Sequence, residues 1–361
     1  MTPLETTRLS PEQIESLSEE QVQELPTILE VLEYLSSLEN TNMRNNLREP
    51  CFEDLYREGK LALMSDQAWT NIPKLYPCSQ TTFTLMRGES DYHADSHPSL
   101  YRPQKNMSDK DSRLIARLRA CEFISILKRH PVVQELESIC KVEYMAIAQH
   151  YEFATEYMDI TNQKWVAAFF ACTEKKGDRY IPVVPRKEKQ IGVVYVGEPT
   201  NNQTYPDKVK ALGFHYFSRP TRQNALVYQM TENENFDADP FFKRIVFRHD
   251  AAASEFVYKM SYEQQRYFPW DRWTEIAESI CRSDYPISQA AIDESRHYGV
   301  MLSDDEIREV LQRNHIPFTA SNVPQAMPMP SLMQEEHYVW RTYLLPHLDR
   351  NTLRLPPIYQ L

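Results

Sequence analysis

Four runs typical of β-strands lie between residues 180 and 249, and helical patterns precede and follow them. The runs read YIPVV, IGVVYV, ALVYQM and RIVFRH, and turns containing Gly, Pro or Asn separate them. This pattern predicts an α+β fold with a central β-sheet core that helices flank. We expect the strands at 83–88, 225–230 and 242–248 to belong to one sheet.

Helix signals are clearest near the two ends of the chain. Ser10, followed three residues later by Gln13, is typical of a helix start, and Ser303 with Glu306 is typical of a capping box. Asp250 is a further candidate N-cap. One early helix is indicated by apolar residues at helical spacing, namely Val22, Leu25, Ile28, Leu29, Leu32 and Leu35. Another is indicated by Leu136, Ile139, Cys140, Tyr144 and Ile147.

These patterns divide the chain into three parts. We predict a helical N-terminal region at 1–79, an α+β domain at 80–280, and a helical C-terminal extension and tail at 281–361.

Composition narrows the class of protein. The formal charge of -11 argues against coating of nucleic acid, so there is no strong nucleic-acid signal. No apolar run is long enough to span a membrane, and no secretory leader is visible, which favours a cytoplasmic protein. The 6 cysteines form no C-x-x-C pair, and a loop containing Pro98 surrounds His93 and His97, so no metal site is expected.

Glycine is scarce, with 7 residues in 361, and neither a Rossmann fingerprint nor a P-loop is present. A nucleotide would therefore be held without a glycine-rich phosphate loop.

Several segments, taken in order, resemble successive parts of the FRG domain family, which is named for a Phe-Arg-Gly motif. They are TLMRGES at 84–90, PSLYR at 98–102, AQHYEFATEYMDIT at 148–161, VAAFFA at 166–171, RQNALVYQ at 222–229 and YFPWDRWTEIAESI at 267–280. The resemblance covers about residues 80–280. Met86, Glu156 and Ile160 depart from the family pattern, whereas Asp159 and Thr161 keep it.

The layout of these segments is also similar, more distantly, to the Arg, Ser, Glu order of ADP-ribosyltransferases, whose split β-core binds NAD. This resemblance implies NAD as the cofactor, with Arg87 on its ribose and phosphates and Gly88 allowing close approach to the backbone. Thr161 would take the place of the Ser, and Gln229 the place of the catalytic Glu. His150 and Tyr151 are further candidates for contacts with the cofactor.

The amide at 229 matters because a carboxylate stabilises the positive ribose of the transition state better than an amide does. Asp159, Glu232 and Glu234 are the carboxylates that could replace it.

Structural roles remain open for the same residues. Arg87 could pair with Glu89 or Asp91, and Thr161 could be a helix N-cap. His150 and Tyr151 could form a hydrogen-bonded structural pair.

Two function classes follow. The first is an effector enzyme that uses NAD, either transferring ADP-ribose to a macromolecular acceptor, as ADP-ribosyltransferases do, or hydrolysing the cofactor. The second is a catalytically silent FRG module that binds a nucleotide or a protein.

Overall fold

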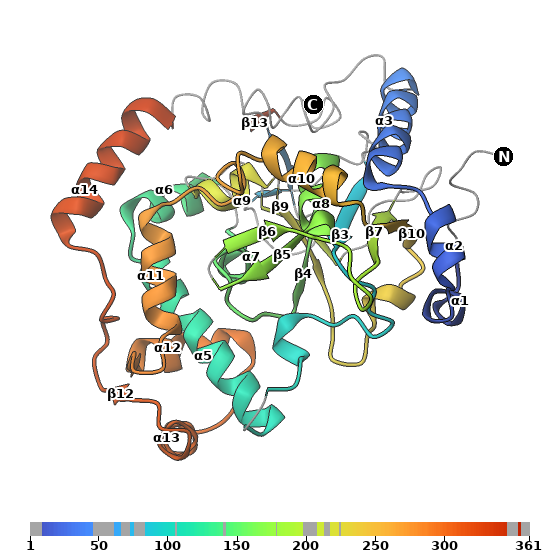
Figure 1. Cartoon of the computed structure of the whole chain (residues 1–361). Helices are drawn as coiled ribbons and strands as arrows, with labels where there is room; N and C mark the ends of the chain where they lie inside the picture. The colour runs from blue at the N-terminus through green and yellow to red at the C-terminus, as the bar shows by residue number, and fades with distance from the viewer. Residues whose placement is uncertain are drawn as a thin grey trace.

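The computed structural model describes residues 9–45, 61–65, 73–75, 84–104, 107–139, 142–177, 179–197, 208–212, 217–223, 225–344 and 353–354. It is an α+β structure in which helices cover a central six-stranded sheet (Figure 1). This confirms the fold class that the sequence predicts.

The central sheet is antiparallel throughout and has the strand order β10-β7-β3-β4-β9-β8. Its strands are β3 (Leu85–Glu89), β4 (Tyr157–Thr161), β7 (Ile191–Gly197), β8 (Val209–Ala211), β9 (Ala225–Gln229) and β10 (Phe242–Arg248). The three strands expected to share one sheet are β3, β9 and β10, and all of them do.

Both faces of this sheet are buried, which explains why its strands are apolar on both sides. On β3, Leu85 joins one hydrophobic cluster and Met86 joins the other. Tyr195 and Val194 of β7 divide in the same way. Because successive side chains point to opposite faces of a strand, β3 and β7 each contribute to two cores.

Different helices cover the two faces. One core contains α5 (Asp109–Leu127), α6 (Pro131–Ile139), α7 (Tyr144–His150), α11 (Arg272–Cys281), α12 (Gln289–Ser295) and α13 (Asp304–Arg313). The other contains α3 (Ile28–Asn45), α8 (Lys164–Cys172) and α10 (Ala251–Met260). The remaining α-helices of the described residues are α1 (Pro11–Glu15), α2 (Glu19–Glu24), α9 (Ser218–Arg222) and α14 (Pro330–Val339).

Smaller elements complete the fold. They are the hairpin β5 (Thr173–Lys176) and β6 (Arg179–Pro182), the pair β11 (Ile287–Ser288) and β12 (Phe318–Thr319), and the sheet of β1 (Leu61–Ser65), β2 (Pro73–Leu75) and β13 (Leu353–Arg354). The region at 1–79 is therefore not wholly helical, since β1 and β2 lie in it.

The C-terminal extension shares the core of the domain. Ile287, Ile307 and Trp340 are buried in the same cluster as Leu118 and Phe123 of α5. Figure 1 shows α12 lying against α5, with α14 at the periphery.

The capping signals are confirmed, and two helix predictions are corrected. Ser10 and Ser303 form capping boxes, and Asp250 caps α10. The early helix is broken between α2 and α3, because Leu25 precedes Pro26 and is extended. The helix expected across 136–147 is likewise two helices, α6 and α7.

Candidate functional site

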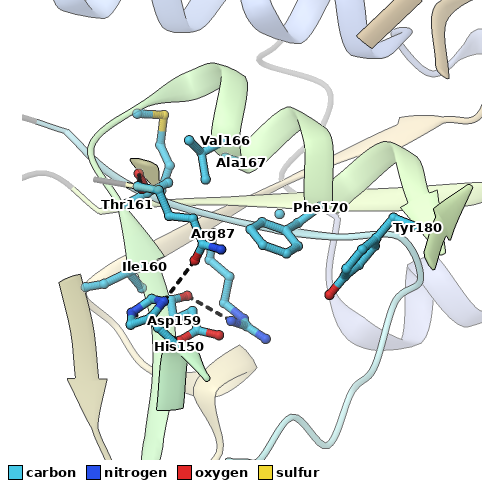
Figure 2. Close-up of a pocket in the computed structure, with 12 residues that line it drawn as sticks. Arg87, His150, Asp159, Ile160, Thr161, Val166, Ala167, Phe170 and Tyr180 are labelled. Carbon is cyan, nitrogen blue, oxygen red and sulfur yellow. Dashed lines mark hydrogen bonds and ion pairs between the residues drawn. The ribbon is translucent and has the colours of Figure 1, made fainter. Parts of the chain in front are cut away.

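The sheet is forked at its centre, in the sense that its two central strands pair with each other at one position only. The central strands β3 and β4 share one registered residue pair, Met86 with Thr161, whereas each pairs along its length with its other neighbour. Beside this junction lies a pocket of about 200 Å³. Its lining residues are Met86, Arg87, Gly88, His150, Asp159, Ile160, Thr161, Val166, Ala167, Phe170, Tyr180 and Gln223 (Figure 2).

Arg87 connects the two strands of the fork. Its Nε donates to Glu89 Oε1 at 2.8 Å, and its Nη1 donates to the main-chain oxygen of Asp159, also at 2.8 Å. Its guanidinium lies 5.8 Å from the centre of the Phe236 ring. Burial lowers the pKa of Arg87, but the charges of Glu89 and Asp159 outweigh burial and raise the pKa above its ordinary value. Arg87 is therefore a charged residue held on two sides.

Gly88 is required by the packing of α8. A Cβ atom at this position would lie 1.8 Å from the carbonyl oxygen of Ala167 and 2.8 Å from the nitrogen of Ala171. Residue 88 lines the pocket, yet the contact that excludes a side chain is with the helix.

Thr161 holds the turn between β4 and α8. Its hydroxyl donates to the main-chain oxygen of Gln223 at 2.9 Å and accepts from the main-chain nitrogen of Gln163 at 3.1 Å. The N-cap of α8 is Gln163, which makes no side-chain cap, so the expectation that Thr161 is the N-cap is wrong. Thr161 is buried, with its hydroxyl already engaged.

His150 and Asp159 bring two buried polar atoms together. The Nδ1 of His150 makes a 2.9 Å hydrogen bond with Gln223 Oε1, and Gln223 Nε2 donates to the carbonyl of Tyr267 at 3.0 Å. The Nε2 of His150 lies 3.6 Å from Asp159 Oδ1. Within the part of the chain that the structure describes, neither of these two atoms has a hydrogen-bond partner.

Two aromatic rings form another part of the pocket wall. Phe170 and Tyr180 pack edge to face with ring centres 5.9 Å apart, and Figure 2 shows them apart from His150 and Asp159. Tyr180 also stacks on Phe268 at 4.8 Å, and its main-chain nitrogen donates to Gln264 Oε1 at 2.7 Å. Burial raises the pKa of Tyr180, so the phenol stays neutral.

The structure does not bring Gln229 into the pocket. Gln229 is opposite Tyr157, at the end of β4 away from Thr161, and its side chain is exposed. Because β9 runs antiparallel to β4, the residue opposite Thr161 is Ala225. The prediction of one cleft holding Arg87, Thr161 and Gln229 is thus corrected for Gln229.

Tyr151 and the two alternative glutamates also lie outside the lining. The Tyr151 hydroxyl donates to Asp271 Oδ2 at 2.8 Å. Glu232 pairs with Arg113 at 2.6 Å, and Glu234 pairs with Lys208. Of the predicted carboxylates, Asp159 alone lines the pocket.

Sequence reasoning missed Gln223 and Tyr180 as pocket residues. Gln223 belongs to RQNALVYQ, one of the segments that carry the family resemblance, and that membership was the available signal. Tyr180 is the first residue of the run YIPVV and has no distinguishing pattern.

This geometry defines an α+β protein with a small pocket beside the junction of the two central strands of an antiparallel sheet. Residues 83–179 match the FRG domain family, so the chain contains an FRG domain. The match includes β3 and β4 and ends before Tyr180, so it is shorter than the 80–280 of the expected resemblance. No match to this chain was found among curated proteins or solved structures.

Two further findings concern metal binding and membrane-spanning helices. Within the described ranges, no group of three or more His, Cys, Asp or Glu residues could hold a metal ion. Nor does any helix among the described residues combine the length and apolar character that crossing a bilayer requires.

Proposed function

We propose that this pocket binds NAD, or a nucleotide of related structure, and that the protein cleaves the bond between nicotinamide and ribose. The observation that carries the proposal is Asp159, a carboxylate with a buried oxygen that no described residue satisfies, in a pocket beside Arg87. The single registered pair between β3 and β4 supports the split core that the resemblance to ADP-ribosyltransferases implies.

The size of the pocket suits one end of a dinucleotide. Its volume of about 200 Å³ is smaller than the roughly 300 to 1,000 Å³ of pockets that enclose drug-sized ligands. A nicotinamide ring with its ribose would occupy it, and the rest of NAD would extend outside. Phe170 and Tyr180 offer aromatic surfaces for the planar ring.

Cleavage needs a group that stabilises positive charge on the ribose. The bond between C1 of the ribose and the nicotinamide nitrogen breaks, and its electron pair goes to nicotinamide. Water, or a nucleophile on a macromolecular acceptor, then bonds to C1 and loses a proton. Asp159 would stabilise the intermediate charge electrostatically, which is the role the resemblance gives to a Glu.

A silent binding module is the second candidate, and the scarcity of carboxylates in the pocket favours it. Of the carboxylates predicted from the sequence only Asp159 lines the pocket, and Gln229, expected in the place of the catalytic Glu, lies outside it. Such a module would bind a nucleotide in the same pocket without cleaving it.

A cleavage assay with a matched carboxylate control separates these candidates. Nicotinamide release from NAD would be followed by chromatography for the parent, for Asp159→Asn and for Glu232→Gln, whose carboxylate pairs with Arg113 outside the pocket. We expect release by the parent and Glu232→Gln, and a loss of at least 100-fold in Asp159→Asn.

Thermal shift with NAD and ADP-ribose completes the experiment. A ligand at 100 times its dissociation constant stabilises the folded protein by about 2.7 kcal/mol. Stabilisation without release would support the silent module. If the ligands cause no stabilisation and no nicotinamide is released, both candidates are excluded.

A further inference from the structure

We infer that Gln223 fixes His150 as a hydrogen-bond acceptor, and that His150 Nε2 and Asp159 Oδ1 together bind the vicinal hydroxyls of a ribose. The inference rests on the proposed nucleotide site, but it concerns binding and does not require cleavage.

The orientation of the Gln223 amide is set by its second partner. Its Nε2 donates to the Tyr267 carbonyl at 3.0 Å, so its Oε1 faces His150. The opposite orientation would place Oε1 against a carbonyl oxygen, and two acceptors would then face each other. Gln223 therefore presents an acceptor to His150.

The tautomer of His150 follows from that acceptor. Nδ1, at 2.9 Å from Gln223 Oε1, must carry the proton and donate it. In a neutral imidazole the other nitrogen is then unprotonated. In its neutral form, His150 thus presents Nε2 as an acceptor.

Two acceptors consequently meet in the pocket. His150 Nε2 and Asp159 Oδ1 are 3.6 Å apart, buried, and without hydrogen-bond partners among the described residues. Buried acceptors without donors are unfavourable, so the pair favours a ligand that supplies two donors side by side. Adjacent hydroxyls on the same face of a ribose have this arrangement.

The position of the aromatic wall indicates that a ribose, and not the carboxamide group of nicotinamide, contacts His150 and Asp159. Phe170 and Tyr180 lie in a separate part of the pocket from His150 and Asp159 (Figure 2). A planar base would contact these rings, and the sugar attached to it would face the acceptor pair. Gln223 acts here as a positioning residue, since it contacts His150 and not the proposed hydroxyls.

The binding test uses ribosides and their deoxy counterparts. Calorimetry would give dissociation constants for nicotinamide riboside and adenosine, each with its 2′-deoxy and 3′-deoxy form, and for nicotinamide alone. The two parent ribosides distinguish the nicotinamide ribose from the adenosine ribose as the source of the diol. We expect either deoxy form of the preferred riboside to bind at least ten-fold more weakly, since hydrogen bonds to charged acceptors are among the stronger ones.

Matched variants locate the effect. Asp159→Asn should reduce the discrimination between riboside and deoxyriboside to within about three-fold, because an amide replaces one acceptor by a donor. Glu232→Gln, which changes a carboxylate outside the pocket, should keep it.

The tautomer is tested independently, in the parent protein, by nitrogen NMR of ¹⁵N-labelled histidine. His150→Gln would assign the signal among the 10 histidines. We expect Nδ1 protonated and Nε2 unprotonated, and a mixture of tautomers in Gln223→Ala. A His150 protonated on both nitrogens in the parent would overturn the inference.

The binding outcomes separate this inference from the proposed function. Riboside discrimination without NAD cleavage would support the inference while the catalytic proposal fails. Equal affinity for ribo and deoxy forms would overturn the inference, with water as the bridge between the acceptors, and would leave cleavage standing. Binding of no riboside, or of nicotinamide alone as tightly as its riboside, would also overturn it.

Discussion

The Nη1 atom of Arg87 donates to the main-chain oxygen of Asp159 at 2.8 Å, across a fork where β3 and β4 share one registered residue pair. The same guanidinium donates to Glu89 through Nε. One side chain thereby joins the two halves of the sheet and lines the pocket between them. Binding and folding are expected to depend on it together.

Arg87→Lys should therefore lose stability as well as ligand affinity. The ammonium group of a lysine, on its flexible side chain, cannot reproduce the two hydrogen bonds of the planar guanidinium. We therefore expect the free energy of unfolding to fall by about 1 to 3 kcal/mol. Urea unfolding measures this. The control is Arg282→Lys, at a residue whose side chain is 67% exposed, which should change stability by less than about 0.5 kcal/mol. Equal stability of parent and Arg87→Lys would argue against the bridging role.

Gly88→Ala should prevent normal packing of α8. The added Cβ would meet the Ala167 carbonyl at 1.8 Å, and backbone cannot move aside as a side chain can. We expect a loss of at least about 3 kcal/mol, or no folded protein. Gly177→Ala is the control: nothing lies within 4 Å there, and its φ of +65° should cost only about 1 kcal/mol. Similar melting temperatures for the two variants would contradict this account.

Thr161→Val keeps the shape of the side chain and removes its hydroxyl. The main-chain oxygen of Gln223 and the main-chain nitrogen of Gln163 would both lose a partner, so we expect a cost of about 1 to 2 kcal/mol in chemical unfolding. Thr161→Ser retains the hydroxyl and should lose less than half as much. If Ser and Val behave alike, the two hydrogen bonds contribute little.

Gln229→Glu should leave NAD cleavage unchanged, although the similarity to ADP-ribosyltransferases implies a catalytic Glu at this position. Gln229 is exposed, opposite Tyr157, and outside the pocket lining. A rate within two-fold of the parent, measured as nicotinamide release, is the expected result. A gain of ten-fold or more would return Gln229 to the active site.

Acid should weaken the contact between α5 and α13. Side-chain hydrogen bonds from Arg313, then from Asn314, lower the pKa of Asp111 to about 2 from its ordinary value near 3.8. A carboxyl whose pKa is lower in the folded state stabilises the protein above the unfolded pKa and loses that contribution as the pH falls toward 2. Because the Arg313 side chain is 56% exposed, we expect only about 1 kcal/mol. Unfolding of Asp111→Asn should depend less on pH between 4 and 2 than unfolding of the parent.

Helix starts and strands were more predictable from the sequence than the set of residues that meet in the pocket. Capping at Ser10, Ser303 and Asp250 depends on residues three apart, so local chemistry determines it. The strands followed from runs of β-branched and aromatic residues. Both signals are contained in short windows of sequence.

The composition of the pocket depends on register and on distant contacts. The resemblance to ADP-ribosyltransferases implies one cleft for Thr161 and Gln229, but the pairing of β4 with β9 puts Ala225 opposite Thr161, and no local pattern fixes that register. Gln223 reaches Thr161 across 62 residues of chain. Asp159 and His150 were identified as candidates, whereas their mutual orientation required the third partner, Gln223.

The single registered pair between β3 and β4 leaves little backbone pairing between the two halves of this sheet. Each half keeps its own ladder of hydrogen bonds, and the bond from Arg87 to the Asp159 main-chain oxygen adds a side-chain link between them. A substitution at residue 87 is therefore expected to act on the junction of the half-sheets while both ladders stay intact.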